Sequence, residues 1–434
     1  MAWDVFGDGT TAIRASGGVF YNFINRAQYQ FNGGALVSNS QVVRNATLDD
    51  ITNFAQVGAQ FAQNPQTVGL PDGFPLTLYG NQLPVGKLQP EKNYQANVAF
   101  QRDLGFNTVA EVAYVGNFGR HFWRAKQTNT IPINAYANPA NLFNNEPIAA
   151  DFLRRDYPGV GQINYLTTDD DVLNYNAMQV SVQRRLTKGL QMGAAYTLSK
   201  AMGVKGWDYV TEELYGKQGL RDRYYGPPSA TQEQDRRHSL VVNYSYQLPN
   251  PLPNVPVVKY LFANWEASGV TQFLTGNAID PVCNTNQSGV LNTNPSLTGV
   301  ATRCELTGQD INAFTPDPNA VFADQVHFNI GAFRRPKPVN GIGNLGDAPI
   351  GVLRHPSWSN WDLTLARRIP VNIGRGGSVR IQWQLYNMWN QVQFTTMDAT
   401  ARFDANGNNV LPNTGKYTET TNPLNMGLTL RFDY

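Results

Sequence analysis

Side chains capable of chemistry are few and scattered in this chain of 434 residues. Only one of its histidines directly precedes a potential nucleophile, as His238 is followed by Ser239. Both fall in a segment of alternating polarity, and neighbouring residues of a strand point to opposite faces, so the two cannot form a nucleophile–base pair. The chain has no G-x-S-x-G turn, phosphate-binding loop or H-E-x-x-H helix. We therefore expect no catalytic residues, no enzymatic activity and no cofactor.

Two acidic segments could supply oxygen ligands to Ca²⁺. Asp169–Asp171 form one, and Asp404, followed by Ala-Asn-Gly-Asn, begins the other. The second segment has the spacing of a calcium loop but lacks its distal bidentate glutamate. Solvated turn residues are the simpler interpretation, and we predict no metal site.

The two cysteines, Cys283 and Cys304, both lie in a segment rich in Asn, Thr and Gly. We predict a disulfide formed in an oxidising compartment. Two free thiols are the alternative, and the absence of a nearby histidine pattern argues against zinc. A bridge would close a loop of about 20 residues, which corresponds to roughly 3 kcal/mol in the chain-entropy model.

Composition excludes several classes of protein. Charged residues make up 15% of the chain, against about 25% in an ordinary soluble domain. The net charge of +2 and the lack of a basic run with aromatics argue against nucleic acid as a partner. No apolar run approaches the ~18–20 residues of a spanning helix. The mean hydropathy of -0.37 still allows a barrel, which exposes only alternate residues to lipid.

The strongest pattern is a repeated period of two. In Val379–Leu385, for example, Val379, Ile381, Trp383 and Leu385 alternate with Arg380, Gln382 and Gln384. Such alternation predicts strands with one apolar and one polar face. Most of these segments are as long as the roughly 9–11 residues that a tilted membrane-spanning strand needs. The ten segments are residues 11–23, 92–102, 106–117, 175–186, 190–201, 237–248, 263–275, 359–369, 378–389 and 424–434.

The connections between these segments alternate in length. The long connections are residues 24–91, 118–174, 202–236, 276–358 and 390–423. The short ones are Asp103–Gly105, Thr187–Gly189, Pro249–Phe262 and Pro370–Gly377. This pattern is typical of an outer-membrane barrel with short periplasmic turns and long extracellular loops. Arg102, Arg184 and Arg367 would face lipid beside the short turns, where a charge costs only about 0–1 kcal/mol.

The polar faces carry Gln, Asn, Ser and Thr where a dry core would need large aliphatic residues. We predict that these side chains line a hydrated or plugged lumen. The candidates are Gln95, Asn97, Glu111, Gln179, Gln183, Glu266, Gln272 and Arg380.

Five segments, taken as an ordered series, resemble strand and loop motifs of TonB-dependent outer-membrane receptors, in particular the Oar-like branch, whose members carry a carboxypeptidase-regulatory-like domain. They are FNTVAEVAYVGNFGRH (106–121), YNAMQVSVQRRLTKGLQMGAAYTLSKAM (175–202), DRRHSLVVNYSYQLP (235–249), GNLGDAPIGVLRHPSWSNWDLTLARRIPV (343–371) and VRIQWQLYNMWNQVQF (379–394). The resemblance implies a 22-stranded barrel, an N-terminal plug, a TonB box and energised uptake of a scarce or large nutrient. Residues 1–434 show about ten strands and neither plug, TonB box nor signal peptide, and they resemble the C-terminal portion of that barrel domain.

The last segment resembles the signal that the outer-membrane assembly machinery reads. Its alternating residues are Met426, Leu428, Leu430, Phe432 and Tyr434. We expect an all-β, antiparallel transmembrane barrel in the outer membrane of a Gram-negative bacterium. Its partners would be outer-membrane lipid, the assembly machinery and, only through a plug missing from this chain, the TonB system. The expected function is uptake of an unidentified substrate, and the alternative is a passive or adhesive barrel that displays surface loops.

Overall fold

A computed structural model gives the fold. The parts of the chain that it describes are residues 1–22, 83–84, 89–121, 124–128, 142–143, 146–147, 163–167, 172–203, 210–211, 235–249, 263–279, 281–283, 304–314, 317, 321–335, 348–349, 351–371, 377–404 and 406–433.

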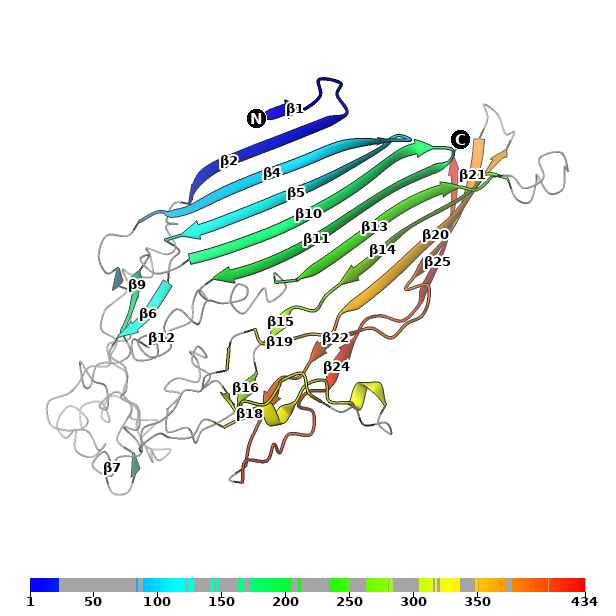
Figure 1. The fold of residues 1–434 in the computed structure, drawn as a ribbon. Coiled ribbons are helices and arrows are strands. Elements are labelled where there is room, and N and C mark those ends of the chain that lie inside the picture. Colours follow the sequence, from blue (N-terminus) through cyan, green and yellow to red (C-terminus); the bar gives the residue numbers. More distant parts are fainter. Residues whose placement is uncertain are drawn as a thin grey trace, which may run out of the picture.

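The main element is a curved antiparallel sheet in which strands follow one another in chain order (Figure 1). In the described residues it has eleven strands, and each of the ten predicted segments overlaps one of them. The all-β, antiparallel prediction is therefore confirmed. The strands are β1 (Ala2–Asp4), β2 (Thr11–Asn22), β4 (Glu91–Gly105), β5 (Thr108–Arg120), β10 (Val172–Thr187), β11 (Leu190–Gly203), β13 (His238–Gln247), β14 (Trp265–Leu274), β20 (Trp358–Val371), β21 (Gly377–Tyr386) and β25 (Asn425–Asp433).

Alternation gives this sheet two unlike faces. The pairing register aligns apolar residues across neighbouring strands, as where Val180 of β10 lies opposite Val112 of β5 and Tyr196 of β11. We call this the apolar face and the opposite one the polar face. Large side chains are exposed on the apolar face, among them Val98, Phe100, Val112, Tyr114, Met178, Trp383 and Leu428. Because exposed apolar area of this extent is unfavourable in water, the face fits contact with lipid.

Two tight turns connect strands at one end of the sheet. Thr187 pairs with Leu190 around Lys188 and Gly189, whose φ angles of 51° and 80° fit a two-residue type I′ turn. Phe106 and Asn107 form the other, with φ angles of 55° and 57°.

The predicted link at Asp103–Gly105 and the predicted strand start at residue 106 are therefore wrong. β4 continues to Gly105 through a register shift, because the Asp103 carboxylate accepts a hydrogen bond from the Gly105 amide at 2.8 Å. The link Thr187–Gly189 is likewise one residue too long, since Thr187 belongs to β10. Most of the predicted links 249–262 and 370–377 lies outside the described residues.

The described sheet is open. Its terminal strands are β1, which pairs with β2 over only three residues, and β25, which pairs with β21. The sequence does not predict β1, because three residues are too few to show a period of two. The N-terminal and C-terminal strands lie at opposite edges (Figure 1).

Smaller elements lie beyond the end of the sheet that is opposite to the tight turns (Figure 1). They are β3 (Leu83–Pro84), β6 (Arg124–Thr128), β7 (Leu142–Phe143), β8 (Glu146–Pro147), β9 (Ile163–Thr167), β12 (Val210–Thr211), β15 (Ala278–Ile279), β16 (Val282–Cys283), β17 (Glu305–Leu306), β18 (Phe333–Arg334), β19 (Leu353–Arg354), β22 (Phe394–Met397), β23 (Thr400–Ala401) and β24 (Tyr417–Thr420), with 3-10 helices η7 (Phe322–Asp324) and η8 (Ile330–Ala332). In the described part of the chain, no helix is long and apolar enough to span a membrane.

Neighbouring positions in the middle of β10 test the assignment of the faces. Val180→Arg should lower the free energy of unfolding in a bilayer by about 2–4 kcal/mol, because the charge would enter lipid. Gln179→Arg, on the polar face, should change it by less than about 1 kcal/mol. Urea unfolding in lipid vesicles measures both values. Equal effects of the two substitutions would contradict the assignment.

Candidate functional site

The eight side chains predicted to line the lumen share the polar face. The pairing register of the sheet places them there: Gln95, Asn97, Glu111, Gln179, Gln183, Glu266, Gln272 and Arg380. Their contact with a lumen stays a prediction, because the described sheet does not close.

An ion pair on the polar face joins two strands across the strand that lies between them, and it passes above an alanine of that middle strand. The Arg14 Nη1 atom of β2 lies 3.9 Å from the Glu111 Oε2 atom of β5. The strand between them is β4, where Ala99 lies directly opposite Arg14 and is only 5% exposed. A longer side chain at Ala99 would occupy the path of the arginine.

The same arrangement recurs further along the sheet. The Glu266 Oε2 atom of β14 lies 3.8 Å from the Arg380 Nη2 atom of β21. Ala366 of β20, which is 3% exposed, lies opposite Glu266 and below this pair. The side chains of both ion pairs are between 35% and 55% exposed, so each pair contributes at most about 1 kcal/mol to stability. Their main effect is to fix opposite charges at defined points of the polar face.

A buried ion pair fastens the loop end of the sheet. The Asp235 side chain is 2% exposed, and its Oδ2 atom accepts a hydrogen bond from Arg354 Nη2 at 2.8 Å. Arg354 Nη1 donates to the backbone oxygens of Asp235 and Gly276, while Asp235 Oδ1 accepts from the amide of Ala201. The pair therefore joins the ends of β11 and β14 to the segments preceding β13 and β20. The sequence does not predict this ion pair, because no local pattern connects residues 119 positions apart.

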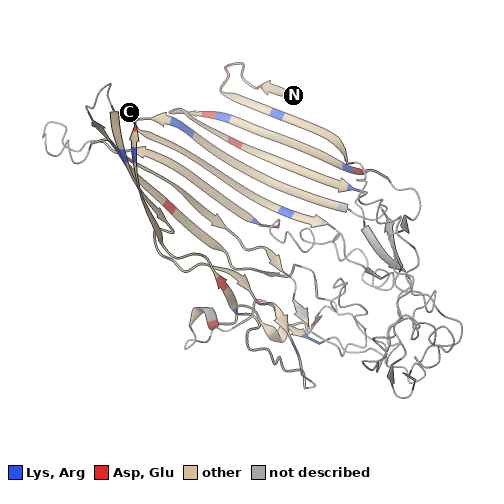
Figure 2. Cartoon of the chain, turned by 180° about the vertical axis from the view of Figure 1, so that it is seen from behind, with Lys and Arg blue, Asp and Glu red and all other residues tan. Residues whose placement is uncertain are grey.

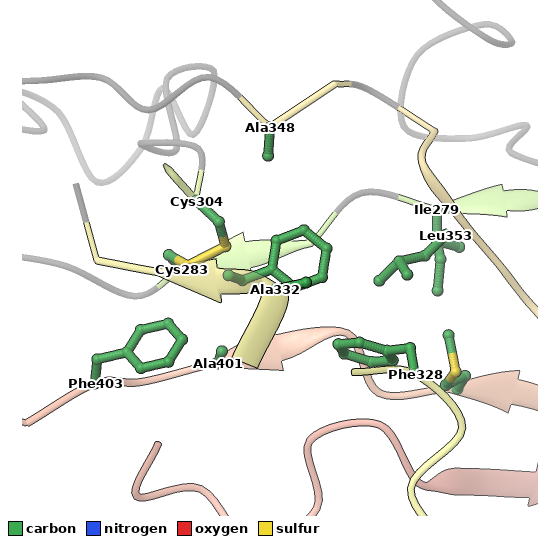
Figure 3. Close-up of a cluster of buried hydrophobic side chains, with 11 residues drawn as sticks. Ile279, Cys283, Cys304, Phe328, Ala332, Ala348, Leu353, Ala401 and Phe403 are labelled. Carbon is green, nitrogen blue, oxygen red and sulfur yellow. A yellow bond between two sulfur atoms is a disulfide. The ribbon is translucent and has the colours of Figure 1, made fainter. Parts of the chain in front are cut away.

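Two long connections pack together beyond the sheet. We call their described residues, between β14 and β20 and between β21 and β25, the loop module. Its centre is a hydrophobic cluster around the disulfide Cys283–Cys304, whose Cα atoms are 5.1 Å apart (Figure 3). The cluster is Ile279, Cys283, Cys304, Phe328, Ala332, Phe333, Ala348, Leu353, Met397, Ala401 and Phe403.

Backbone contacts connect the two halves of the loop module. β16 pairs in parallel with β23, so that Cys283 lies opposite Ala401. The Met397 amide donates to His355 Nδ1 at 3.1 Å, and the His327 amide donates to the Gly415 carbonyl at 2.9 Å. Because each half supplies partners for the other, the two connections form one packed unit.

An aromatic group lies at the surface of this unit. The rings of His327 and Tyr417 stack with centroids 3.7 Å apart and planes 5° from parallel. Phe322 packs on both rings and on Phe394, yet it remains 58% exposed. Burial lowers the pKa of His327 and raises that of Tyr417, so both rings favour their neutral forms.

The Asp404 carboxylate is used by its own turn. Its Oδ1 atom accepts hydrogen bonds from the amides of Asn406 and Asn408 at 2.9 and 2.8 Å. Both hydrogen bonds lower the pKa of Asp404, and the bond from Asn408 has the larger effect. In the described residues no group of three or more His, Cys, Asp or Glu side chains could hold a metal ion. Asp169–Asp171 lie outside the described residues.

The predicted assembly signal lies on the edge strand β25. Met426, Leu428, Leu430 and Phe432 share the apolar face and are strongly exposed, Leu428 at 71%. Tyr434 lies outside the described residues. Recognition by assembly machinery stays a prediction.

Comparison with known proteins establishes the family. A family model described as "Outer membrane beta barrel domain" matches residues 1–427, and the chain therefore belongs to this family. Its location is accordingly the outer membrane, as the sequence predicted. No curated protein matches the chain.

Several solved outer-membrane transporters resemble the chain at 9% sequence identity. The outer membrane transporter YddB from Escherichia coli has a TM-score of 0.42, with 99% of this chain and 39% of that protein covered. The ferric-catecholate import receptor Fiu from E. coli K12 has a TM-score of 0.39, with 100% of this chain and 34% of that protein covered. The FrpB iron transporter from Neisseria meningitidis has a TM-score of 0.39, with 100% of this chain and 38% of that protein covered. The chain thus spans well under half of the length of each of these proteins.

The disulfide should stabilise the loop module without stabilising the sheet. The double substitution Cys283→Ser and Cys304→Ser should lower the free energy of unfolding of the module by about 3 kcal/mol. Limited proteolysis of the folded protein measures this loss as faster cleavage within the module. Heat-modifiable migration in gels should stay unchanged, because the strands of the sheet contain neither cysteine. Unchanged cleavage rates in the double variant would refute the expectation.

The contact between His355 and Met397 should weaken in acid. Burial, the largest cause, and the charge of Arg236 lower the pKa of His355, and the charge of Glu419 acts against them. A depressed histidine pKa gives stability that is complete above the unfolded value of about 6.5 and is lost as pH falls toward the folded pKa. The pKa of His327 is also lowered, so its contribution to stability is likewise lost as pH falls.

Hydrogen exchange at the Met397 amide measures this effect. Protection, corrected for the intrinsic rate, should fall between about pH 7.5 and pH 5 as His355 becomes protonated. His355→Gln retains an acceptor that does not titrate, and it should remove most of the pH dependence. A wild-type protection factor that is the same at both pH values would show that His355 does not control this contact.

Proposed function

We propose that this chain is the C-terminal portion of the barrel of a TonB-dependent receptor of the Oar-like branch and takes part in uptake of a substrate across the outer membrane. The observation that carries this proposal is the two-faced sheet with open edges. Its apolar face fits lipid, and its polar face presents amides and fixed charges of both signs.

The open edges favour a larger barrel. Unpaired backbone N–H and C=O groups cost several kcal/mol each in hydrocarbon, so β25 and the free part of β2 need further strands beside them in the membrane. The resemblance of the sequence motifs implies 22 strands, of which the described sheet would supply about half. The remaining strands and a plug would be contributed by other parts of the same polypeptide.

The polar face supports transport rather than catalysis. A wall of Gln and Asn side chains stays hydrated and can contact a plug or a polar cargo through many exchangeable hydrogen bonds. Coupling to the TonB system would run through the plug, and we propose no enzymatic activity. Lipid on the apolar face and the assembly machinery at β25 complete the proposed partners, with no role for nucleic acid.

The loop module favours a second candidate function. A disulfide-bridged unit with its own hydrophobic core is suited to contact with other surfaces, as in a passive or adhesive barrel. Such a protein would need no plug, and this difference separates the two candidates.

Photo-crosslinking tests for the plug. A benzophenone amino acid at Gln179, on the polar face, should crosslink in outer membranes to another segment of the same polypeptide, identified by mass spectrometry. The same probe at Val180, on the apolar face, is the matched control and should crosslink to lipid. The polypeptide carrying the probe should also be much larger than 48.1 kDa.

A different result would overturn the proposal. If the protein migrates as a heat-modifiable 48.1 kDa species and position 179 gives no protein crosslink, these strands close without a plug. Loss of cell adhesion on removal of the loop module would then identify the display function.

A further inference from the structure

Charges are sorted between the two faces of the sheet. In the described strands of this eleven-stranded sheet from β2 to β25, every Asp and Glu lies on the polar face. These acids are Glu91, Asp103, Glu111, Glu266, Asp362 and Asp433. The apolar face has only cations among its fully charged residues, and Figure 2 shows how sparsely charge is spread over the sheet. The cations are Lys92, Arg102, Arg120, Arg184, Lys200 and Arg367.

The cations of the apolar face occupy its two ends. Arg102, Arg184 and Arg367 lie toward the tight turns, as expected from the sequence. Lys92 and Arg120 lie at the opposite end, beside the loops. Since the tight turns mark the periplasmic side in this class of barrel, the second pair faces the outer leaflet.

Lys92 and Arg120 form part of one cross-strand row. Lys92 of β4 lies directly opposite Arg120 of β5 on one side and Tyr21 of β2 on the other. The next row toward the middle of the sheet on this face contains Tyr94 and Phe118. Two cations and a tyrosine hydroxyl therefore lie beside an aromatic row. Aromatic belts of membrane proteins lie at the depth of the lipid headgroups.

The two neighbouring positive charges of this row favour binding of an anion. Like charges directly opposite each other on a sheet are destabilising. In the described part of the chain no carboxylate pairs with Lys92, and the adjacent Glu91 lies on the polar face, where it accepts a hydrogen bond from Asn22. The described hydrogen bonds of Arg120 all use Nη1, which donates to Gly119, Leu173 and Asn174 and holds the guanidinium beside the strand.

We propose that the row Tyr21, Lys92 and Arg120 binds the phosphate group of an outer-leaflet lipid. A planar guanidinium and an ammonium suit phosphate oxygens, and the neighbouring aromatic row would contact the acyl chains or the sugar of a phosphorylated glycolipid. Arg367, near the turns, is less suited, because it packs on Trp265 and donates to the Ala263 carbonyl. The lipid neutralises a repulsion that the protein leaves uncompensated.

Native mass spectrometry of the detergent-purified full-length protein tests this assignment. The probes are lipid A with its phosphates, lipid A from which the phosphates have been removed, and inorganic phosphate. Wild-type protein should retain phosphorylated lipid A at least about tenfold better than the dephosphorylated form, since each cation near an anionic surface contributes on the order of 1 kcal/mol. Inorganic phosphate should displace it poorly.

Paired substitutions locate the site. Lys92→Gln with Arg120→Gln should weaken retention of phosphorylated lipid A about 30-fold. Arg102→Gln with Arg184→Gln removes the same charge from the other end of the face and should leave retention within about twofold of wild type. Heat-modifiable migration verifies folding of both variants. Should the first variant fail to fold, the comparison of the two lipids on wild-type protein still decides the question.

Three results would overturn the proposal. Equal retention of both forms of lipid A would show that acyl chains alone are bound. Equal weakening by both pairs of substitutions would show a diffuse charge effect. Full displacement by inorganic phosphate would show a site for the free ion.

Discussion

The structure depends on one constraint: inside a bilayer, every backbone N–H and C=O group must find its partner within the protein. A sheet meets this requirement strand by strand, and its side chains are then free to satisfy two different solvents. Lipid is in contact with one set of alternate residues, and water or other protein with the next. The two tight turns at one end and the packed unit at the other keep the irregular backbone outside the zone where this constraint applies.

The two ends of the chain's architecture are stabilised in different ways. The sheet relies on backbone hydrogen bonds and on its apolar face, so its polar face can carry amides, small residues and charges. The loop module lies beyond the end of the sheet (Figure 1) and has a conventional hydrophobic core built around the disulfide. Arg354 and Asp235 connect the two regions through a buried ion pair, which holds one geometry because a buried charge tolerates little displacement.

Much of the sheet could be predicted because its signal is local. Alternation repeats within each strand, and the ends of the ten predicted segments lie within a few residues of the observed strand ends. The errors have local causes as well: the hydrogen bond from Gly105 to Asp103 carries β4 past the predicted turn, and β1 is too short to show a period. The pairing of the cysteines could be inferred since the chain has only two. The contacts of Arg354 and His355 join segments far apart in the chain, and no pattern in the sequence reveals which residues the fold will bring together.

The fusion of two connections into one loop module restricts how this surface can change. Lengthening either connection near β16 or β23 would displace its partner, so the two must vary together. The turn after Asp404 is different, because a Cβ atom at Gly407 would meet nothing within 4 Å and Asn406 and Asn408 are exposed. In the proposed orientation, a peptide tag or fluorophore inserted there would project from the cell surface while leaving the core around the disulfide intact, which makes this turn the natural attachment point for labelling the protein on living cells.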